Sequence, residues 1–124
     1  MAGKFFDEWQ IGETITHEIR RTVTEADNIW FCSATYNPAQ IHIDFEYCRQ
    51  TEFKQPLVNS IFTLGLVIGL TVQDTTLGTT VLEKRESKSR PNAGIVTFLH
   101  QGFNQRGEEV CTCTRQALML KAPT

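Results

Sequence analysis

The sequence predicts an α+β domain in which an antiparallel sheet wraps around one long buried helix. The helix is indicated by Ile61–Val72, a run that is apolar on nearly every helical face, with no charged residue between Lys54 and Asp74. The sheet is indicated by the C-terminal third, where apolar and polar residues alternate between turn-rich stretches. A helix without a polar face must be enclosed, and a curled antiparallel sheet can enclose it.

Length and composition narrow the class of protein. A chain of 124 residues suits a single domain over 1–124, near the size at which association helps to bury surface. The formal charge of −2 leaves no basic footprint for nucleic acid. The first ten residues lack the apolar core of a signal peptide, and Ile61–Val72 is shorter than the roughly 20 residues of a membrane span. We therefore expect a soluble cytoplasmic protein that does not enter membranes.

The four cysteines do not follow a metal-binding or disulfide pattern. Cys111 and Cys113 would share one face of a strand, but no CxxC motif or paired histidine accompanies them, so no zinc site is expected. We expect them, together with Cys32 and Cys48, to be free thiols.

The N-terminal part of the chain is predicted to contain an anchored lead, a strand and a helix. Lys4–Gln10 carries three aromatic residues, and Glu13–Val23 alternates and is rich in isoleucine and threonine, which favours a strand. Thr24 then caps a helix over Glu25–Ala34, with Asp27 at the capping-box position.

Turns and a short helix precede the buried helix, and strands follow it. The Asn-Pro pair in Tyr36–Gln40 predicts a turn, and Asp44 can cap a helical piece that reaches Phe53. Residues 74–80 are expected to form a polar exit from the buried helix. The rest of the chain is predicted to contain three strands, Val81–Ser87, Ile95–Gln105 and Glu109–Leu120.

The start of the buried helix is a candidate binding site for an anion. Pro56 stops any preceding helix, Asn59 is a good N-cap, and Ser60 lies in the first turn with unpaired N–H groups. These groups and the helix dipole could hold a developing oxyanion, although an ordinary capped helix has the same features. Gly65 and Gly69 allow close approach to the sheet or leave room for a ligand arm.

One histidine stands out as a candidate for proton transfer. His42 is flanked by isoleucines, and it lies between a polar turn with Asn37 and the helix start at Ser60. The ordinary pKa of histidine, about 6.5, suits this chemistry. A histidine between apolar residues is also often structural, and we expect that role for His17 and His100.

The histidine-containing turn and the helix that follows it resemble those of a known family. The chain is similar to MaoC-like dehydratases, the family of (R)-specific enoyl-CoA hydratases with the hot-dog fold. The similarity lies in two segments, SATYNPAQIHID and TEFKQPLVNSIFTLGLVIG, which resemble the family's D-x-N-P-x-H turn, its T-x-F step and its central helix. The resemblance implies a homodimer or higher homo-oligomer and the reversible hydration of a trans-2-enoyl-CoA thioester, or dehydration of a 3-hydroxyacyl-CoA. Coenzyme A would be part of the substrate, with no further cofactor. The resemblance makes His42 the catalytic histidine and the N–H of Ser60, or of Ile61, the oxyanion donor.

The chain departs from the family pattern at two places. The family's acid, five residues before the histidine, is Asn37 here, and an amide cannot accept a proton. His42 would then be the only titrating group of the pair, with Asn37 holding water or substrate. The second departure lies near Val81 and Leu82, where GTTV runs directly into LEKRES. Family members have a further strand pair with Pro and Gly-Asp there, so we expect a missing or deleted segment.

A basic stretch before Pro91 is a candidate for binding the phosphates of coenzyme A. Its members are Lys84, Arg85, Lys88 and Arg90. Glutamates are interleaved with them, so a solvated charged edge is the competing interpretation.

Two other functions remain open from the sequence. A hot-dog acyl-CoA thioesterase would need a carboxylate on or near the central helix, and Ile61–Val72 has none. A non-catalytic acyl-CoA-binding homologue would explain the amide at Asn37.

Overall fold

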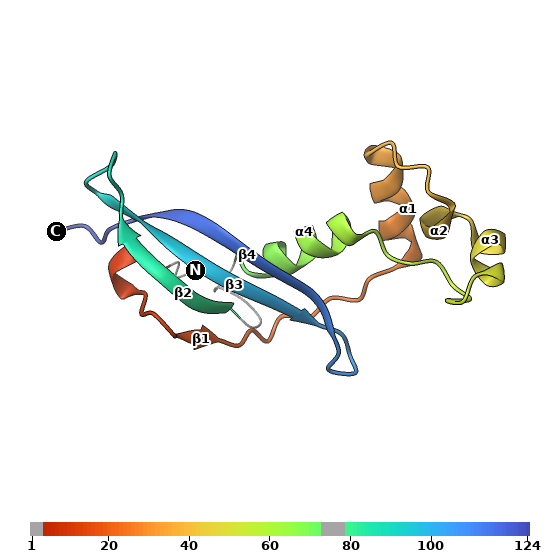
Figure 1. Cartoon of the computed structure of the whole chain (residues 1–124), viewed down its shortest axis with the longest axis horizontal. Helices are drawn as coiled ribbons and strands as arrows, with labels where there is room; N and C mark the ends of the chain where they lie inside the picture. The colour runs from red at the N-terminus through yellow and green to blue at the C-terminus, as the bar shows by residue number, and fades with distance from the viewer. Residues whose placement is uncertain (1–3, 73–78) are drawn as a thin grey trace. The chain divides into compact units, whose positions relative to one another are not determined.

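The computed structural model describes residues 4–72 and 79–124, and the chain divides into two compact units. We call residues 1–19 with 66–124 the sheet unit and residues 20–65 the helical unit. The elements in chain order are η1 Phe6–Glu8, β1 Thr14–Ile15, α1 Glu25–Ala34, α2 Gln40–Ile43, α3 Phe45–Gln50, α4 Ser60–Leu70, β2 Thr79–Glu86, β3 Ala93–Phe103 and β4 Glu109–Leu120 (Figure 1).

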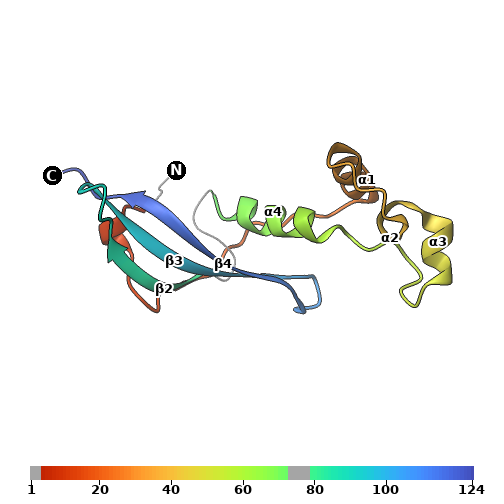
Figure 2. The same cartoon turned by 45° about the horizontal axis from the view of Figure 1, so that its top comes forward.

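The sheet unit contains four antiparallel strands in the order β1-β2-β3-β4, and Figure 2 shows β2, β3 and β4 side by side. These three strands lie within two residues of the predicted ranges, and β4 has the predicted bounds. The β3–β4 turn forms because the Asn104 Oδ1 accepts the N–H groups of Arg106 at 2.9 Å and Glu108 at 3.0 Å. Gly107 adopts a φ of +76°, a conformation that favours glycine.

The predicted strand over Glu13–Val23 is wrong in its length. In the described residues β1 comprises only Thr14 and Ile15, which lie opposite Thr80 and Thr79 of β2. The polar exit predicted at 74–80 lies mostly outside the described residues, and its last two residues are in β2.

Strand β2 is continuous across the position where a missing segment is predicted. Its register shifts between Val81 and Glu83, so Leu82 has no partner on β3 and is 45% exposed. A bulge is therefore present at the predicted junction. The deletion itself stays a prediction.

The core of the sheet unit lies on one face of the strands. Trp9 packs edge-on against Phe98 with ring centroids 5.0 Å apart, and a side chain at Gly94 would overlap the Phe6 ring. Val81 and Val96 complete the buried cluster. Phe6 and Trp9 thus anchor the N-terminal lead, as predicted, whereas the third aromatic residue, Phe5, is 39% exposed.

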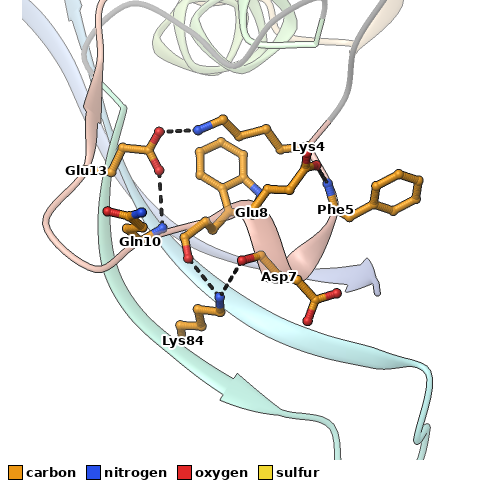
Figure 3. Close-up of polar contacts among 8 residues, drawn as sticks. Lys4, Phe5, Asp7, Glu8, Gln10, Glu13 and Lys84 are labelled. Atoms are coloured by element: carbon orange, nitrogen blue, oxygen red, sulfur yellow. Dashed lines mark hydrogen bonds and ion pairs between the residues drawn. The ribbon is translucent and has the colours of Figure 1, made fainter. Parts of the chain in front are cut away.

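Lys84 fastens this lead to β2 (Figure 3). Its ammonium group donates to the Trp9 carbonyl at 2.8 Å and lies 4.5 Å from the centre of the Phe6 ring. Lys4 pairs with Glu13 on the same segment. Lys84 therefore has a structural role, and the predicted basic stretch retains Arg85, Lys88 and Arg90 as candidates.

The helical unit begins with α1, whose bounds are as predicted. Thr24 and Asp27 form a reciprocal capping box, with Thr24 N donating to the Asp27 carboxylate at 2.8 Å. Arg21 donates to the same carboxylate at 2.6 Å, and these contacts lower the pKa of Asp27 to about 2. Asp44 caps α3 by accepting from Tyr47 N at 2.9 Å, but α3 ends at Gln50 rather than near the predicted Phe53.

Helix α4 starts as predicted but is less enclosed than its composition suggests. Asn59 accepts the N–H of Ile61 at 2.9 Å, whereas within α4 only Val67 is buried and Ile61 is 61% exposed. Val67 lies over Gly102 of β3, where a side chain would overlap it, while the space beside Gly65 and Gly69 is open. Within the described residues, no helix combines the length and apolar character that crossing a membrane requires.

Candidate functional site

The structure brings His42 to the segment that leads into α4. Its Nδ1 lies 2.8 Å from the carbonyl oxygen of Leu57, which is two residues before the Asn59 cap. The backbones are joined as well, because Leu57 N donates to the Ile41 carbonyl at 2.9 Å. The predicted proximity of the histidine to the start of α4 is therefore observed within the helical unit.

This contact fixes how the His42 ring can act. A carbonyl oxygen only accepts hydrogen bonds, so in the neutral ring Nδ1 must carry the hydrogen. The lone pair is then on Nε2. An imidazole held in this tautomer can take a proton through Nε2 and return it, which general acid–base chemistry requires.

Asn28 of α1 is a second organising residue, and the sequence analysis missed it. Its side chain is 3% exposed and reaches three backbone groups, at His42, Leu57 and Asn59. The available signal was its spacing of four residues from Cys32, which places both side chains on the inner face of α1.

A cavity of about 160 Å³ lies beside the histidine. Its lining includes His42 and Asn28, together with the exposed acidic residue Glu25. The remaining lining residues are Val23, Thr24, Phe45, Gln55, Pro56 and Val58. Neither Glu25 nor Gln55 was expected from sequence, because nothing in their local pattern indicates what they face.

Asn37 is anchored within its own turn. Its N–H donates to the Cys32 carbonyl at 2.9 Å, and its side-chain oxygen accepts the N–H of Ala39 at 3.0 Å. It is half-buried and is not among the residues that line the cavity with His42. Its side-chain nitrogen remains available, so a role in holding water or substrate stays a prediction.

The start of α4 offers one of the two N–H groups considered for an oxyanion. The Ile61 N–H donates to the Asn59 side chain at 2.9 Å, which makes it the less available of the two. No hydrogen bond within residues 4–72 and 79–124 uses the Ser60 N–H, and Ser60 is exposed. Ser60 therefore remains the predicted donor.

The second buried histidine of the sheet unit has the expected structural surroundings. The Thr79 hydroxyl lies 2.9 Å from the Nδ1 of His100, and Arg115 Nε donates to its Nε2 at 2.8 Å. Burial, followed by the charge of Arg115, lowers the pKa of His100 to about 4. The ring is therefore neutral at pH 7. His17 is also buried.

The remaining predicted ligand sites are the basic stretch and the cysteines. Arg85, Lys88 and Arg90 lie exposed at or near the β2–β3 connection, and their contact with phosphate stays a prediction. All four cysteines are free thiols. Across the described ranges, no group of three or more histidine, cysteine or acidic side chains is placed to hold a metal ion.

Solved structures define the class of this domain. The crystal structure of a MaoC-like dehydratase from Rhodospirillum rubrum matches with a TM-score of 0.83 and 26% identity, covering 98% of this chain and 100% of that one. The antiparallel sheet and the capped apolar helix thus belong to the hot-dog fold, as predicted.

The family follows from the sequence match. The model of the MaoC like domain matches residues 7–90, and the chain belongs to this family. It is 25% identical over 148 aligned positions to the mesaconyl-CoA hydratase of Cereibacter sphaeroides, covering 99% of this chain and 43% of that protein. A β-methylmalyl-CoA dehydratase of Chloroflexus aurantiacus is 27% identical over 75 residues, 60% of this chain and 21% of that protein. The chain spans less than half the length of these curated relatives.

Proposed function

We propose that this protein catalyses the reversible hydration of a trans-2-enoyl-CoA to a 3-hydroxyacyl-CoA, with His42 as the proton-transfer group. The observation that carries the proposal is the imidazole held by the Leu57 carbonyl at 2.8 Å, beside a cavity and next to the start of α4. Relatives named mesaconyl-CoA hydratase and β-methylmalyl-CoA dehydratase support a CoA thioester as the substrate class.

In the proposed reaction His42 carries one proton from water to the substrate. The Nε2 of His42 takes a proton from water while the hydroxyl adds to the β-carbon of the enoyl group. The charge that develops on the thioester oxygen is stabilised by the Ser60 N–H and the positive end of α4. His42 then returns the proton to the α-carbon, so that one water is added across the double bond. Asn37, which does not line the cavity with His42, is left to contact the substrate through its side-chain nitrogen.

Glu25 supplies the carboxylate that this chain lacks at residue 37, where the family pattern has an acid. It lines the cavity that contains His42, whereas Asn37 does not. In this arrangement Glu25 accepts a hydrogen bond from the attacking water and stabilises the imidazolium that His42 becomes while it carries the proton.

The same carboxylate supports a second candidate function. A hot-dog thioesterase activates water with a carboxylate near its substrate, and Glu25 is such a group although α4 has none. Thioester hydrolysis would release free coenzyme A, whereas hydration leaves the thioester intact. One assay can therefore separate the two reactions.

We further propose that the protein acts as a cytoplasmic homodimer and needs no cofactor besides the coenzyme A of its substrate. Support for association comes from α4, an apolar helix whose first turn carries Ile61 at 61% exposure. A large exposed apolar side chain on an otherwise apolar helix is a surface that a partner copy can cover.

The test is direct. Purified protein is mixed with crotonyl-CoA or mesaconyl-CoA, and the loss of enoyl absorbance is followed in parallel with free thiol. We expect absorbance loss without thiol release. Thiol release would identify a thioesterase, and binding without either change would identify a non-catalytic homologue; both results would overturn the proposal.

A further inference from the structure

The side chain of Asn28 is the point at which three backbone segments of the helical unit meet. Its Nδ2 donates to the His42 carbonyl at 3.0 Å and to the Leu57 carbonyl at 2.9 Å, and its Oδ1 accepts the Asn59 N–H at 2.8 Å. The amide thereby uses both of its donor hydrogens and its acceptor at a position that is 3% exposed.

The Leu57 carbonyl is shared by two donors. Asn28 Nδ2 approaches it at 2.9 Å and His42 Nδ1 at 2.8 Å. The oxygen that sets the tautomer and orientation of the imidazole is therefore itself held by Asn28. In addition, Asn28 fixes the backbone of His42 directly, so it restrains both the ring and the residue that carries it.

The third contact of Asn28 is with the cap of α4, the helix whose amino end is proposed to bind the thioester oxygen. Asn59 caps α4 by accepting the Ile61 N–H at 2.9 Å, and Asn28 holds the backbone N–H of Asn59. One amide thus connects the imidazole to the helix start that would face the thioester oxygen.

We propose that Asn28 is a positioning residue that fixes the separation and orientation of His42 relative to the amino end of α4. The inference rests on the proposed hydration at His42 but concerns a different group. A hydratase must hold the β-carbon near its base while the thioester oxygen lies at its donor, and a misplacement of about 1 Å can cost about 100-fold in rate.

Two variants test the proposal. Asn28→Ala removes all three contacts. Asn28→Asp keeps the size of the side chain and the acceptor for Asn59 N–H, but its carboxylate has no donor for the His42 and Leu57 carbonyls. The control on the same helix is Ser33→Ala, because Ser33 is exposed and takes no part in the contacts that Asn28 makes.

Two independent readouts follow for each variant. ¹⁵N NMR of histidine-labelled protein reports the tautomer of His42, assigned with His42→Gln among only three histidines. Steady-state hydration reports kcat and KM separately. In the native protein we expect the Nδ1–H tautomer. In both Asn28 variants we expect mixed tautomers and a kcat about 100-fold lower with KM changed less than about threefold.

The outcomes are distinguishable from failure of the proposed function. If the native protein does not hydrate enoyl-CoA, the tautomer measurement still tests the positioning. If Asn28→Ala does not fold, as judged by circular dichroism against Ser33→Ala, the Asp variant carries the test. A folded Asn28→Asp protein with the native tautomer, and with a kcat equal to that of Ser33→Ala where activity exists, would overturn the inference.

Discussion

At the scale of single residues, the Leu57 carbonyl shows how a backbone atom can set the chemistry of a side chain. It accepts from His42 Nδ1 at 2.8 Å, which leaves Nε2 as the basic nitrogen. The sequence predicted that His42 would lie near the start of α4, because the turn, the histidine and the cap follow one another along the chain. It could not predict Asn28, whose three partners come from two other segments and meet only in the folded unit.

Glu25 is a second residue whose place beside His42 could not be predicted from sequence, and it leads to a prediction. Glu25→Gln is expected to lower the kcat for hydration about 100-fold, because the cavity loses its carboxylate. Adding Asn37→Asp to this variant is expected to restore part of the activity, since the acid then returns to the position of the family pattern. Steady-state kinetics with crotonyl-CoA measure both effects.

The control for this series is Glu46→Gln on α3. Glu46 forms an exposed ion pair with Arg49 at 3.2 Å and does not line the cavity. Equal activity of the Glu25 and Glu46 variants would remove Glu25 from the mechanism.

At the scale of elements, the predicted bounds were correct where the sequence of the element alone determines them, and incorrect where they depend on a neighbouring element. The predicted bounds of α1 and β4 are confirmed, because a capping box and a long alternating run are contained in the elements themselves. The strand predicted over Glu13–Val23 comprises only Thr14 and Ile15, because the extent of a strand depends on pairing with a partner that its own sequence does not contain. The apolar composition of Ile61–Val72 correctly predicted that α4 exists. The close contact between α4 and the sheet, however, is made by Val67 over Gly102 of β3 and not at Gly65 or Gly69 of the helix.

The three strands β2, β3 and β4 are also joined through a titratable group. His100 on β3 contacts Thr79 of β2 and Arg115 of β4, and its pKa is lowered to about 4. The unfolded chain, with an ordinary histidine pKa near 6.5, binds more protons between these values, so stability falls as pH drops through this range. Between pH 7 and 5 we expect this histidine to reduce the free energy of unfolding by about 2 kcal/mol.

Urea unfolding of the native protein and of His100→Asn at pH 7 and pH 5 measures this contribution. The variant is expected to lose less stability over the interval, because its side chain does not titrate. Asp27 does not interfere, since its carboxyl, with a pKa of about 2, stays ionised in this range. An identical pH dependence in both proteins would contradict the account of His100.

At the scale of the whole molecule, the fold class is the part that sequence predicted best. An apolar run and an alternating C-terminal third predicted an antiparallel sheet curled around a helix. The resemblance to MaoC-like dehydratases implied the hot-dog fold, which solved structures confirm. The alignment with the mesaconyl-CoA hydratase runs over 148 positions, 24 more than this chain has residues. This relative therefore carries residues within the aligned region that the present chain lacks. The predicted missing or deleted segment near Val81 and Leu82 stays a prediction.

Association is the prediction that belongs to this scale. Light scattering is expected to give a mass of twice 14.1 kDa for the native protein, and Ile61→Glu is expected to shift it toward the single-chain value. The added charge would lie on the apolar surface of α4, where Ile61 is 61% exposed. Ile11→Glu is the control, because Ile11 is 65% exposed and lies outside α4. A native protein that scatters as a single chain would contradict the proposed dimer.

The central claim is that the imidazole of His42 transfers the proton in hydration of an enoyl thioester. The most direct measurement compares the rates of crotonyl-CoA hydration by the native protein and by His42→Ala, with Gln40→Ala on the same short helix as the control. We predict a loss of about 1,000-fold for His42→Ala and native activity for Gln40→Ala. Hydration by His42→Ala within threefold of the native rate would contradict the account.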